Sequence, residues 1–282
     1  MRKLFIRAAP VRKLKDDMMN RGLVQPHLNP EEYPYKDLKE IAQKVNELAI
    51  ESRTAALLRR DFFANASHEL KTPITAIKGN AELLCAEVPL GEGQKQELLQ
   101  RIGIEAERLH RLVNDIIMVS RLENGELAGE TEEVNLTEIV RACVDEVMVQ
   151  VKKNQLRVDV DLEPVTLLAN QKNVYEICSN LIVNAANYTR SGGRVEIRLS
   201  ASETEAVFTI RNDAEPIPPG HQPRLFERFY RLDAGRSKAA GGTGLGLSIV
   251  KHAVESLGGT VRLESDARIG VLFTVAIPTA NA

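Results

Sequence analysis

The feature that most constrains this chain is a helical spacing of apolar side chains that runs from Leu38 to Leu84. The first part of the spacing consists of Leu38, Ile41, Val45, Leu48, Ser52, Ala55, Arg59, Phe62 and Ala66. Alternating intervals of three and four residues are typical of a coiled-coil seam. The polar Ser52 and Arg59 weaken this seam, so an amphipathic helix that packs on its own chain is the alternative. We predict a coiled-coil helix over residues 36–57 that pairs two copies of the chain.

The second part of the spacing carries the same helix past a proline. Its members are Phe62, Ala66, Leu70, Pro73, Ile77, Ala81 and Leu84, which fall within about 100° of arc on a helix. A proline inside a helix removes one amide donor and normally causes a kink, but the unbroken phase favours one kinked helix over two. His68 lies about 190° from the centre of this stripe, so we expect its imidazole to point toward solvent.

A second helix follows a break at residues 89–93, Pro-Leu-Gly-Glu-Gly. Its helical spacing consists of Leu98, Ile102, Leu109, Leu112, Val113, Ile116 and Ser120. Two antiparallel helices alone bury too small a core, and two copies overcome this by forming a four-helix bundle. We therefore predict an α-helical hairpin over residues 58–126 that dimerises into a four-helix bundle.

Helices and strands are mixed beyond residue 134. The patterns predict helices near 137–153, 171–188 and 244–257, and strands near 156–162, 193–200, 205–212, 260–265 and 271–277. Strands adjacent in the sequence, such as 193–200 and 205–212, should pair as hairpins. The fold class predicted for residues 134–280 is an α+β sandwich, a mixed β-sheet covered by helices on one face.

Residues 1–35 combine early basic side chains with prolines at positions 26, 30 and 34. Because prolines interrupt helices, we predict an irregular basic N-terminal arm. Two interpretations stay open: a solvated, partly disordered arm, or a segment just inside a membrane whose anchoring helix is absent from this chain. No apolar run approaches the roughly 18 residues that a span needs, so we expect no direct membrane span within the chain.

Charge and cysteine usage exclude other classes. The chain has 37 Lys and Arg against 39 Asp and Glu, a formal charge of −2, and we expect no nucleic-acid partner because such binders usually carry a basic excess. Cys85, Cys143 and Cys178 lack the Cys-x-x-Cys spacing of zinc or redox sites. We predict that all three are small core residues in a reducing compartment.

Two segments carry residue types that suit a phosphorylated ligand. Residues 241–247, Gly-Gly-Thr-Gly-Leu-Gly-Leu, precede an apolar helix, whose N-terminus and close-approaching amides favour phosphate. The loop lacks the lysine of a P-loop and the strand context of a dinucleotide site. Asn180, Asn184 and Asn187 share one face of a predicted helix, and amide oxygens suit a Mg²⁺ ion that also binds phosphate. A solvated helix face is the alternative.

Four short motifs follow one another along the chain. They are residues 65–73, Asn-Ala-Ser-His-Glu-Leu-Lys-Thr-Pro, residues 180–189 with the three asparagines, residues 225–231, Leu-Phe-Glu-Arg-Phe-Tyr-Arg, and the glycine loop at 242–247. In this order they resemble the H box, N box, F box and second glycine box of sensor histidine kinases of bacterial two-component systems. The resemblance covers about residues 58–280. It implies a dimerisation and histidine phosphotransfer domain at 58–126 and a Bergerat-type ATP-binding domain at 134–280.

The resemblance implies roles for three residues of the H box. His68 resembles the phosphoacceptor. A solvent-facing imidazole fits this role, because a neutral ring nitrogen must reach the γ-phosphate. Glu69 would accept a hydrogen bond from the other ring nitrogen and fix the tautomer. Thr72, one turn beyond His68, matches the position where related kinases orient a water that hydrolyses the aspartyl phosphate of the partner protein.

The resemblance also implies a site for ATP and Mg²⁺. Asn184 resembles the Mg²⁺ ligand, with Asn180 as its helper, while Tyr188 would lie on the adenine face and Arg231 would neutralise charge on the γ-phosphoryl group. Residues 233–242 would form a mobile lid over the nucleotide. The other positions implied to bind the nucleotide are Asn187, Asn212, Ile217, Gly242, Thr243, Gly244, Leu245 and Gly246.

The sequence departs from the family pattern in two motifs, the N box and the first glycine box. Asn187 stands where the family usually has Lys, Arg or His. Asn212 stands at the adenine-reading aspartate of the first glycine box, whose two usual glycines are replaced by Ala214 and Pro216. An amide oxygen still accepts a hydrogen bond from the adenine amino group, so we expect a weakened contact rather than a lost one.

The function implied is that of the cytoplasmic part of a homodimeric sensor histidine kinase, whose full-length form is anchored in the cell membrane. ATP would phosphorylate His68, the phosphoryl group would pass to an aspartate of a response regulator receiver domain, and the kinase would also dephosphorylate that regulator. One rival is a degenerate, non-catalytic signalling scaffold with a decayed first glycine box. Another is an ATP-driven conformational machine of the wider Bergerat superfamily, which would not need an exposed His68.

Overall fold

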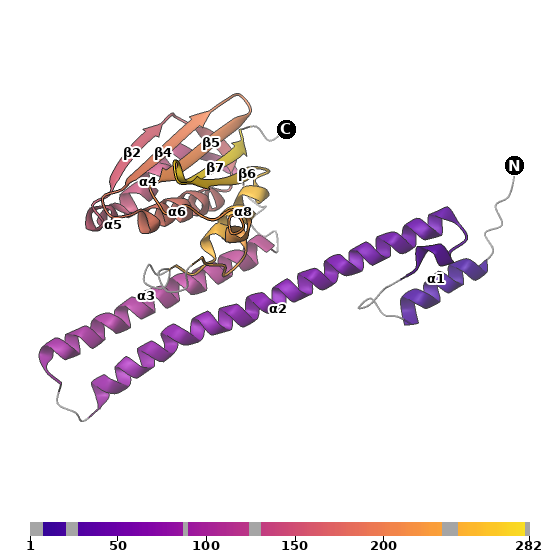
Figure 1. The fold of residues 1–282 in the computed structure, drawn as a ribbon, viewed down its shortest axis with the longest axis horizontal. Coiled ribbons are helices and arrows are strands. Elements are labelled where there is room, and N and C mark those ends of the chain that lie inside the picture. Colours follow the sequence, from indigo (N-terminus) through magenta and orange to yellow (C-terminus); the bar gives the residue numbers. More distant parts are fainter. Residues whose placement is uncertain (1–7, 21–27, 87–89, 124–130, 233–241, 280–282) are drawn as a thin grey trace. The chain divides into compact units, whose positions relative to one another are not determined.

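The computed structural model of the 282-residue chain describes residues 8–20, 28–86, 90–123, 131–232 and 242–279 (Figure 1). The chain divides into two compact units, Met1–Ser67 and His68–Ala282. A long helix, α2 (Lys36–Cys85), begins in the first unit and ends in the second. It passes through Pro73 without interruption, so the prediction of a single helix is confirmed.

The first unit contains a helix that the sequence did not predict. Helix α1 (Ala8–Asn20) and a short 3-10 helix, η1 (Pro30–Glu32), precede α2. The expectation of an irregular arm over residues 1–35 is therefore wrong for Ala8–Asn20. The buried residues Leu14, Leu28, Tyr33, Leu38 and Ala42 form a small core between α1 and the first turns of α2. The basic segment therefore forms an amphipathic helix whose apolar face packs on α2, a feature that its basic composition does not reveal.

The predicted coiled-coil seam is divided between two environments. Leu38 is buried in the small core and Val45 packs against it, so these members contact their own chain. Asn46 reinforces the contact, because its side-chain oxygen accepts from the Leu28 amide at 3.0 Å and its Nδ2 donates to the Leu28 carbonyl at 2.7 Å. Ile41 and Leu48 are 47% and 53% exposed. Pairing of this helix with a second copy stays a prediction.

The second unit opens with a helical hairpin. The part of α2 from His68 onward runs beside α3 (Glu92–Glu123), as predicted for residues 58–126 (Figure 1). Leu112, Met118 and Val119 of α3 are buried. None of the helices in the described ranges has the length and apolar character needed to cross a membrane.

A five-stranded mixed sheet follows, in the order β2-β4-β5-β7-β6. Its strands are β2 (Arg157–Leu162), β4 (Arg194–Ala201), β5 (Glu205–Asn212), β6 (Thr260–Asp266) and β7 (Gly270–Pro278). β2 pairs parallel with β4 and the other pairs are antiparallel, including the predicted β4–β5 hairpin. A small second sheet of β1 (Glu132–Asn135) and β3 (Thr166–Ala169) was not predicted.

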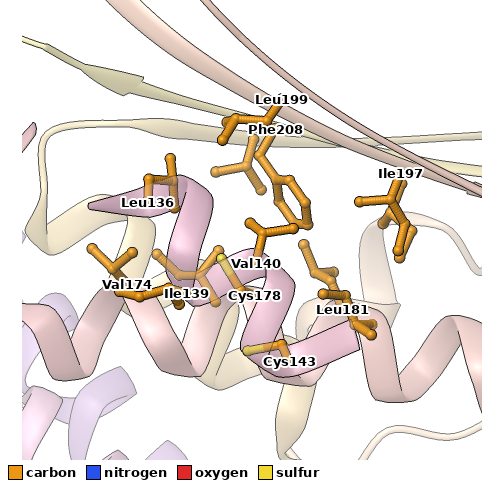
Figure 2. Close-up of a cluster of buried hydrophobic side chains, with 14 of the residues drawn as sticks. Leu136, Ile139, Val140, Cys143, Val174, Cys178, Leu181, Ile197, Leu199 and Phe208 are labelled. Atoms are coloured by element: carbon orange, nitrogen blue, oxygen red, sulfur yellow. The ribbon is translucent and has the colours of Figure 1, made fainter. Parts of the chain in front are cut away.

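Helices cover one face of the large sheet, which confirms the predicted α+β sandwich (Figure 1). They are α4 (Leu136–Glu146), α5 (Met148–Lys153), α6 (Gln171–Tyr188) and α8 (Gly246–Ser256). The helix predicted at 137–153 is divided at Val147 into α4 and α5. Figure 2 shows Leu199 and Phe208 of the sheet facing Val140 and Leu181 of the helices in one apolar core. This core holds α6 and α8, which carry the candidate site, in place.

The cysteines occupy two kinds of position. Cys143 and Cys178 lie in the core (Figure 2), and burial raises the pKa of both thiols, to about 12 for Cys143. Cys85 is exposed at the last residue of α2, so its prediction as a core residue is wrong. The physical reason is that the apolar stripe of α2 ends at Leu84, one position earlier on another side of the helix.

Candidate functional site

Helix α6 places the three predicted asparagines together. Its buried face includes Ile177, Cys178 and Leu181, and the N-cap Asn170 accepts from the Asn173 amide at 3.2 Å. Asn180, Asn184 and Asn187 are half-buried at the border of this face. A solvated helix face, the alternative for these residues, would leave them exposed.

The orientation of Asn180 is fixed by Glu176, one turn earlier. The Asn180 Nδ2 donates to the Glu176 carbonyl at 2.8 Å and to Glu176 Oε2 at 3.2 Å. A Cβ atom on Gly246 would lie 2.5 Å from Asn180 Oδ1, so this oxygen faces the first residue of α8. Burial, and next the charge of Asp115, raise the pKa of Glu176. Glu176 was not predicted from the sequence, although its place four residues before Asn180 could have indicated it.

The second glycine box packs against the F box. Gly244 has a φ of +77°, and a Cβ atom there would lie 2.9 Å from Phe229 Cα. The Phe229 amide donates to the Gly244 carbonyl at 2.8 Å. Leu245 is buried, while Gly242, Thr243 and Gly246 are half-buried just before and at the start of α8. The structure thus brings the predicted glycine loop to a helix N-terminus beside Asn180, where amides and the helix dipole favour an anion.

Asn212 lies at the end of β5 and is 4% exposed. Its Nδ2 donates to Thr189 Oγ1 at 3.1 Å, and the Thr189 hydroxyl donates to the Ala185 carbonyl at 2.5 Å. This arrangement directs Nδ2 of Asn212 to Thr189 and leaves Oδ1 as the side-chain atom that can accept a hydrogen bond. Thr189 closes the N box but was not singled out from the sequence, and its hydroxyl is what orients Asn212.

The remaining predicted nucleotide positions surround this end of the sheet. Ile217 is half-buried, and its amide donates to Ser265 Oγ at 2.9 Å. Tyr188, the last residue of α6, is 42% exposed, which leaves its ring available for stacking. The predicted lid over residues 233–242 lies outside the described residues except for Gly242.

The acceptor motif lies on the exposed face of α2. His68 is exposed, as predicted, and Thr72 is exposed with its hydroxyl donating to the His68 carbonyl at 3.4 Å. Within the described ranges no hydrogen bond joins the side chains of His68 and Glu69, in contrast to the role expected of Glu69. The Glu69 carboxylate lies instead 3.5 Å from Arg108 Nη2 and 4.0 Å from Arg231 Nη1.

The Glu69 contacts bring the F box to the acceptor motif. The side chains of Arg108 and Arg231 are each 11% exposed, so both guanidinium groups lie in a partly desolvated environment. Arg231 was predicted from the sequence, whereas Arg108 on α3 was missed because its partner is distant in the chain. A cation beside the acceptor is suited to stabilise the charge of a phosphoryl group in transfer.

The donor set fits a magnesium ion that shares its coordination with phosphate. Among the described residues, no group of three or more His, Cys, Asp and Glu side chains could hold a metal by itself. The amide oxygens of Asn180 and Asn184 on one face of α6 are the neutral ligands that Mg²⁺ accepts when phosphate oxygens and water complete its shell.

Two family models match the chain. The model described as Histidine kinase-, DNA gyrase B-, and HSP90-like ATPase matches residues 169–281. The model of the His Kinase A (phospho-acceptor) domain matches residues 58–125, which include the exposed His68. The chain belongs to the two-component sensor histidine kinases. The resemblance seen in the four sequence motifs is therefore confirmed.

Curated relatives agree with this assignment. The chain is 34% identical over 218 residues to the phosphate regulon sensor protein PhoR of Pseudomonas aeruginosa, covering 77% of this chain and 49% of PhoR. It is 35% identical over 221 residues to the sensor-like histidine kinase SenX3 of Mycobacterium tuberculosis, covering 78% of this chain and 54% of SenX3. The chain thus spans about half the length of the curated relatives it matches.

Solved structures share the fold of this chain. The Acinetobacter baumannii histidine kinase AdeS aligns with a TM-score of 0.61 at 23% identity, over 76% of this chain and 98% of AdeS. Full-length ShkA in complex with AMPPNP aligns with a TM-score of 0.57 at 25% identity, over 78% of this chain and 46% of ShkA. The histidine kinase ThkA, solved in complex with the response regulator protein TrrA, aligns with a TM-score of 0.62 at 23% identity, over 81% of this chain and 64% of that chain.

Proposed function

We propose that this chain transfers the γ-phosphoryl group of ATP to His68 and then to an aspartate of a response regulator receiver domain. The observation that carries the proposal is the position of Arg231 of the F box. Its Nη1 lies 4.0 Å from the carboxylate of Glu69, the residue next to the exposed His68. A cation of the nucleotide domain and the acceptor motif therefore lie side by side within one compact unit.

The described residues give ATP a consistent place. Oδ1 of Asn212 would accept from the adenine amino group, and the ring of Tyr188 would stack on the base. The backbone amides of residues 242–246 would bind the phosphates at the N-terminus of α8. Asn184 and Asn180 would hold Mg²⁺, which neutralises triphosphate charge when bound. The half-buried Asn187 would contribute only a neutral contact, because it lacks the charge usual at that position.

The chemistry needs an accessible nitrogen and a stabilised charge. The lone pair of a His68 ring nitrogen forms the N–P bond while the bond from the γ-phosphorus to the bridging oxygen breaks, and ADP leaves with that electron pair. The exposed imidazole releases its remaining ring proton to water. Arg231 stabilises the charge on the transferring group, and Arg108 balances Glu69 beside it. The same N–P bond then breaks as an aspartate carboxylate of the regulator takes the phosphoryl group.

The exposed Thr72 supports a second activity, removal of the phosphoryl group from the regulator. Thr72 lies one turn beyond His68, so its hydroxyl faces the same solvent region that a docked receiver domain would occupy. In the isolated chain this hydroxyl is bonded to the His68 carbonyl, and rotation about one side-chain bond would direct it to a water.

A second copy of the chain would complete the helical hairpin. Large apolar side chains of the hairpin are exposed in the single chain, among them Ile74 at 50%, Leu99 at 59% and Ile104 at 66%. Exposed apolar surface on a two-helix hairpin favours burial in a four-helix bundle. We infer that the functional kinase is a homodimer. We propose that this portion lies on the cytoplasmic side of the membrane in which the whole protein would be anchored, where it would meet ATP and a response regulator.

Incubation of the chain with γ-labelled ATP and Mg²⁺ tests the proposed function. Acid-labile, alkali-stable label on the protein is the expected result, because phosphohistidine has this stability. Release of labelled phosphate without protein label would instead indicate an ATP-driven conformational machine. Absence of both protein label and hydrolysis would indicate the non-catalytic scaffold, the alternative suggested by Ala214 and Pro216 in place of the two usual glycines.

A further inference from the structure

Asp115 of α3 contacts the glycine loop directly. Its Oδ2 accepts a hydrogen bond from Thr243 Oγ1 at 2.6 Å, and the same Oγ1 accepts from the Leu245 amide at 3.2 Å. The Thr243 hydroxyl therefore both donates and accepts a hydrogen bond, and its proton is directed at Asp115 rather than into the loop. This pair joins the helical hairpin to the predicted phosphate-binding residues across 128 positions of sequence.

Packing holds the Asp115 carboxylate at this place. Helices α3 and α8 lie against each other, and Val119 on α3 and Leu245 at the start of α8 are completely buried. Burial raises the pKa of Asp115, while its hydrogen bond from Thr243 and the nearby charge of Arg111 act in the opposite direction. Burial is the largest of the three effects, so the pKa lies above its ordinary value although the hydrogen-bond partner and the neighbouring cation both favour the ionised form.

A second carboxylate lies near the first. Glu176 is close enough to Asp115 for their charges to interact, and Glu176 also binds Asn180, the expected helper of the metal ligand. Two carboxylates thus lie beside the loop that is suited to a triphosphate. Like charges in a partly buried site repel strongly, because solvent screens them poorly.

We propose that Asp115 sets the ATP affinity of the nucleotide site in its own chain: the carboxylate competes with the triphosphate for the Thr243 hydroxyl, and ATP binds tightly only when α3 withdraws it. The inference rests on the proposed function in one respect, that the glycine loop binds the phosphates of ATP. A shift of α3 in the hairpin would then change nucleotide affinity. Because coupling is reciprocal, bound ATP would in turn weaken the hydrogen bond between Asp115 and Thr243.

A purely structural role for Asp115 makes a different prediction. Asp115→Asn keeps an oxygen that accepts from Thr243 but removes the negative charge. If Asp115 only tethers two helices, this variant binds ATP as the wild type does. If the charge opposes the triphosphate, the variant binds ATP more tightly.

The test is a titration of the full chain with a fluorescent ATP analogue in the presence of Mg²⁺. Asp115→Asn should bind about three- to tenfold more tightly than wild type, a range that corresponds to removal of one partly screened charge. Glu107→Gln, which neutralises an exposed carboxylate elsewhere on α3, is the matched control and should bind as wild type does. Thermal unfolding followed by circular dichroism verifies that each variant is folded.

The outcomes separate the inference from the proposed function. Binding by wild type with equal or weaker binding by Asp115→Asn overturns the role of Asp115 and leaves the nucleotide site in place. Binding only by Asp115→Asn supports the role in its strongest form. Absence of binding by both proteins overturns the inference together with the proposed function.

Should Asp115→Asn fail to fold, Thr243→Ser and Thr243→Val replace it. The serine variant keeps the hydroxyl and should bind ATP as wild type does. Binding of ATP by the valine variant equal to that of wild type would contradict the competition for the hydroxyl.

Discussion

The acceptor hairpin and the nucleotide domain present their functional side chains in opposite ways. His68 and Thr72 are exposed on α2, and the Thr72 hydroxyl donates to the backbone carbonyl of His68 on the same helix. Asn180 is half-buried and Asn212 is buried, and the side chain of each is oriented by a hydrogen bond to the side chain of another residue. Under the proposed function, a group that meets both a nucleotide and a regulator has to be accessible, whereas a site that recognises one small ligand gains from preorganised polar groups.

Thiol reactivity should show the largest contrast between the two regions. Cys85 is exposed at the end of α2, while Cys143 and Cys178 are buried in the nucleotide domain. With a pKa of about 12, the Cys143 thiol is ionised in only about one molecule in 10⁴ at pH 8. We expect a maleimide to modify Cys85 at least about a thousandfold faster than the other two, as measured by mass spectrometry. Rapid labelling of Cys178 in native protein, before denaturant exposes it, would break the comparison.

The same glycine substitution should have opposite effects in the two regions. Gly244→Ala places a side chain at a φ of +77° and 2.9 Å from Phe229 Cα, so we expect at least about a tenfold loss of ATP affinity. Gly103→Ala on α3 has open space around its Cβ and should stabilise the helix by roughly 0.5–1 kcal/mol. Nucleotide titration and thermal unfolding measure the two effects. Unchanged nucleotide binding by Gly244→Ala would show that this loop does not form the site.

Removal of one threonine hydroxyl should distinguish the regions by stability. Thr189→Val leaves the buried Asn212 Nδ2 without its acceptor and should cost about 1–3 kcal/mol of unfolding free energy. Thr72→Val removes an exposed hydroxyl, should stay within about 0.5 kcal/mol, and should slow dephosphorylation of the regulator while sparing autophosphorylation. Urea unfolding and decay of phosphorylated regulator are the measurements. Equal decay rates with and without the Thr72 hydroxyl would make Thr72 an ordinary surface residue.

The acceptor hairpin and the nucleotide domain also differ in how well the sequence predicts their candidate site residues. His68 and its exposure followed from helical periodicity and a local motif, because neighbours in a helix are fixed by spacing. Asn180, Asn184 and the glycine loop were also predicted, since their residue types are unusual for their elements. Glu176, Thr189, Arg108 and Asp115 were not singled out. Their importance depends on the tertiary partner of each side chain, and a carboxylate on a helix ordinarily indicates only a solvated face.

The smallest expected effect concerns the adenine contact. Asn212→Asp replaces an amide oxygen by a carboxylate, and a charge-assisted hydrogen bond to the adenine amino group should tighten ATP binding by about two- to fivefold. The Thr189 hydroxyl can turn from the Ala185 carbonyl to the new carboxylate. The neighbouring Asp213 accepts from the Arg194 amide at 3.0 Å and lies 3.8 Å from Arg211, so its charge is largely balanced. Titration with the ATP analogue measures the change, and weaker binding would show that Asn212 does not contact adenine.

The most direct test of the division between the regions compares His68→Gln with Asn184→Ala. Both variants are incubated with γ-labelled ATP and Mg²⁺, and nucleotide binding is measured in parallel. We predict that His68→Gln binds the ATP analogue as wild type does but takes up no acid-labile label, and that Asn184→Ala loses both binding and label. Acid-labile label on His68→Gln, or loss of nucleotide binding in that variant, would contradict the assignment of acceptor and nucleotide site to separate regions.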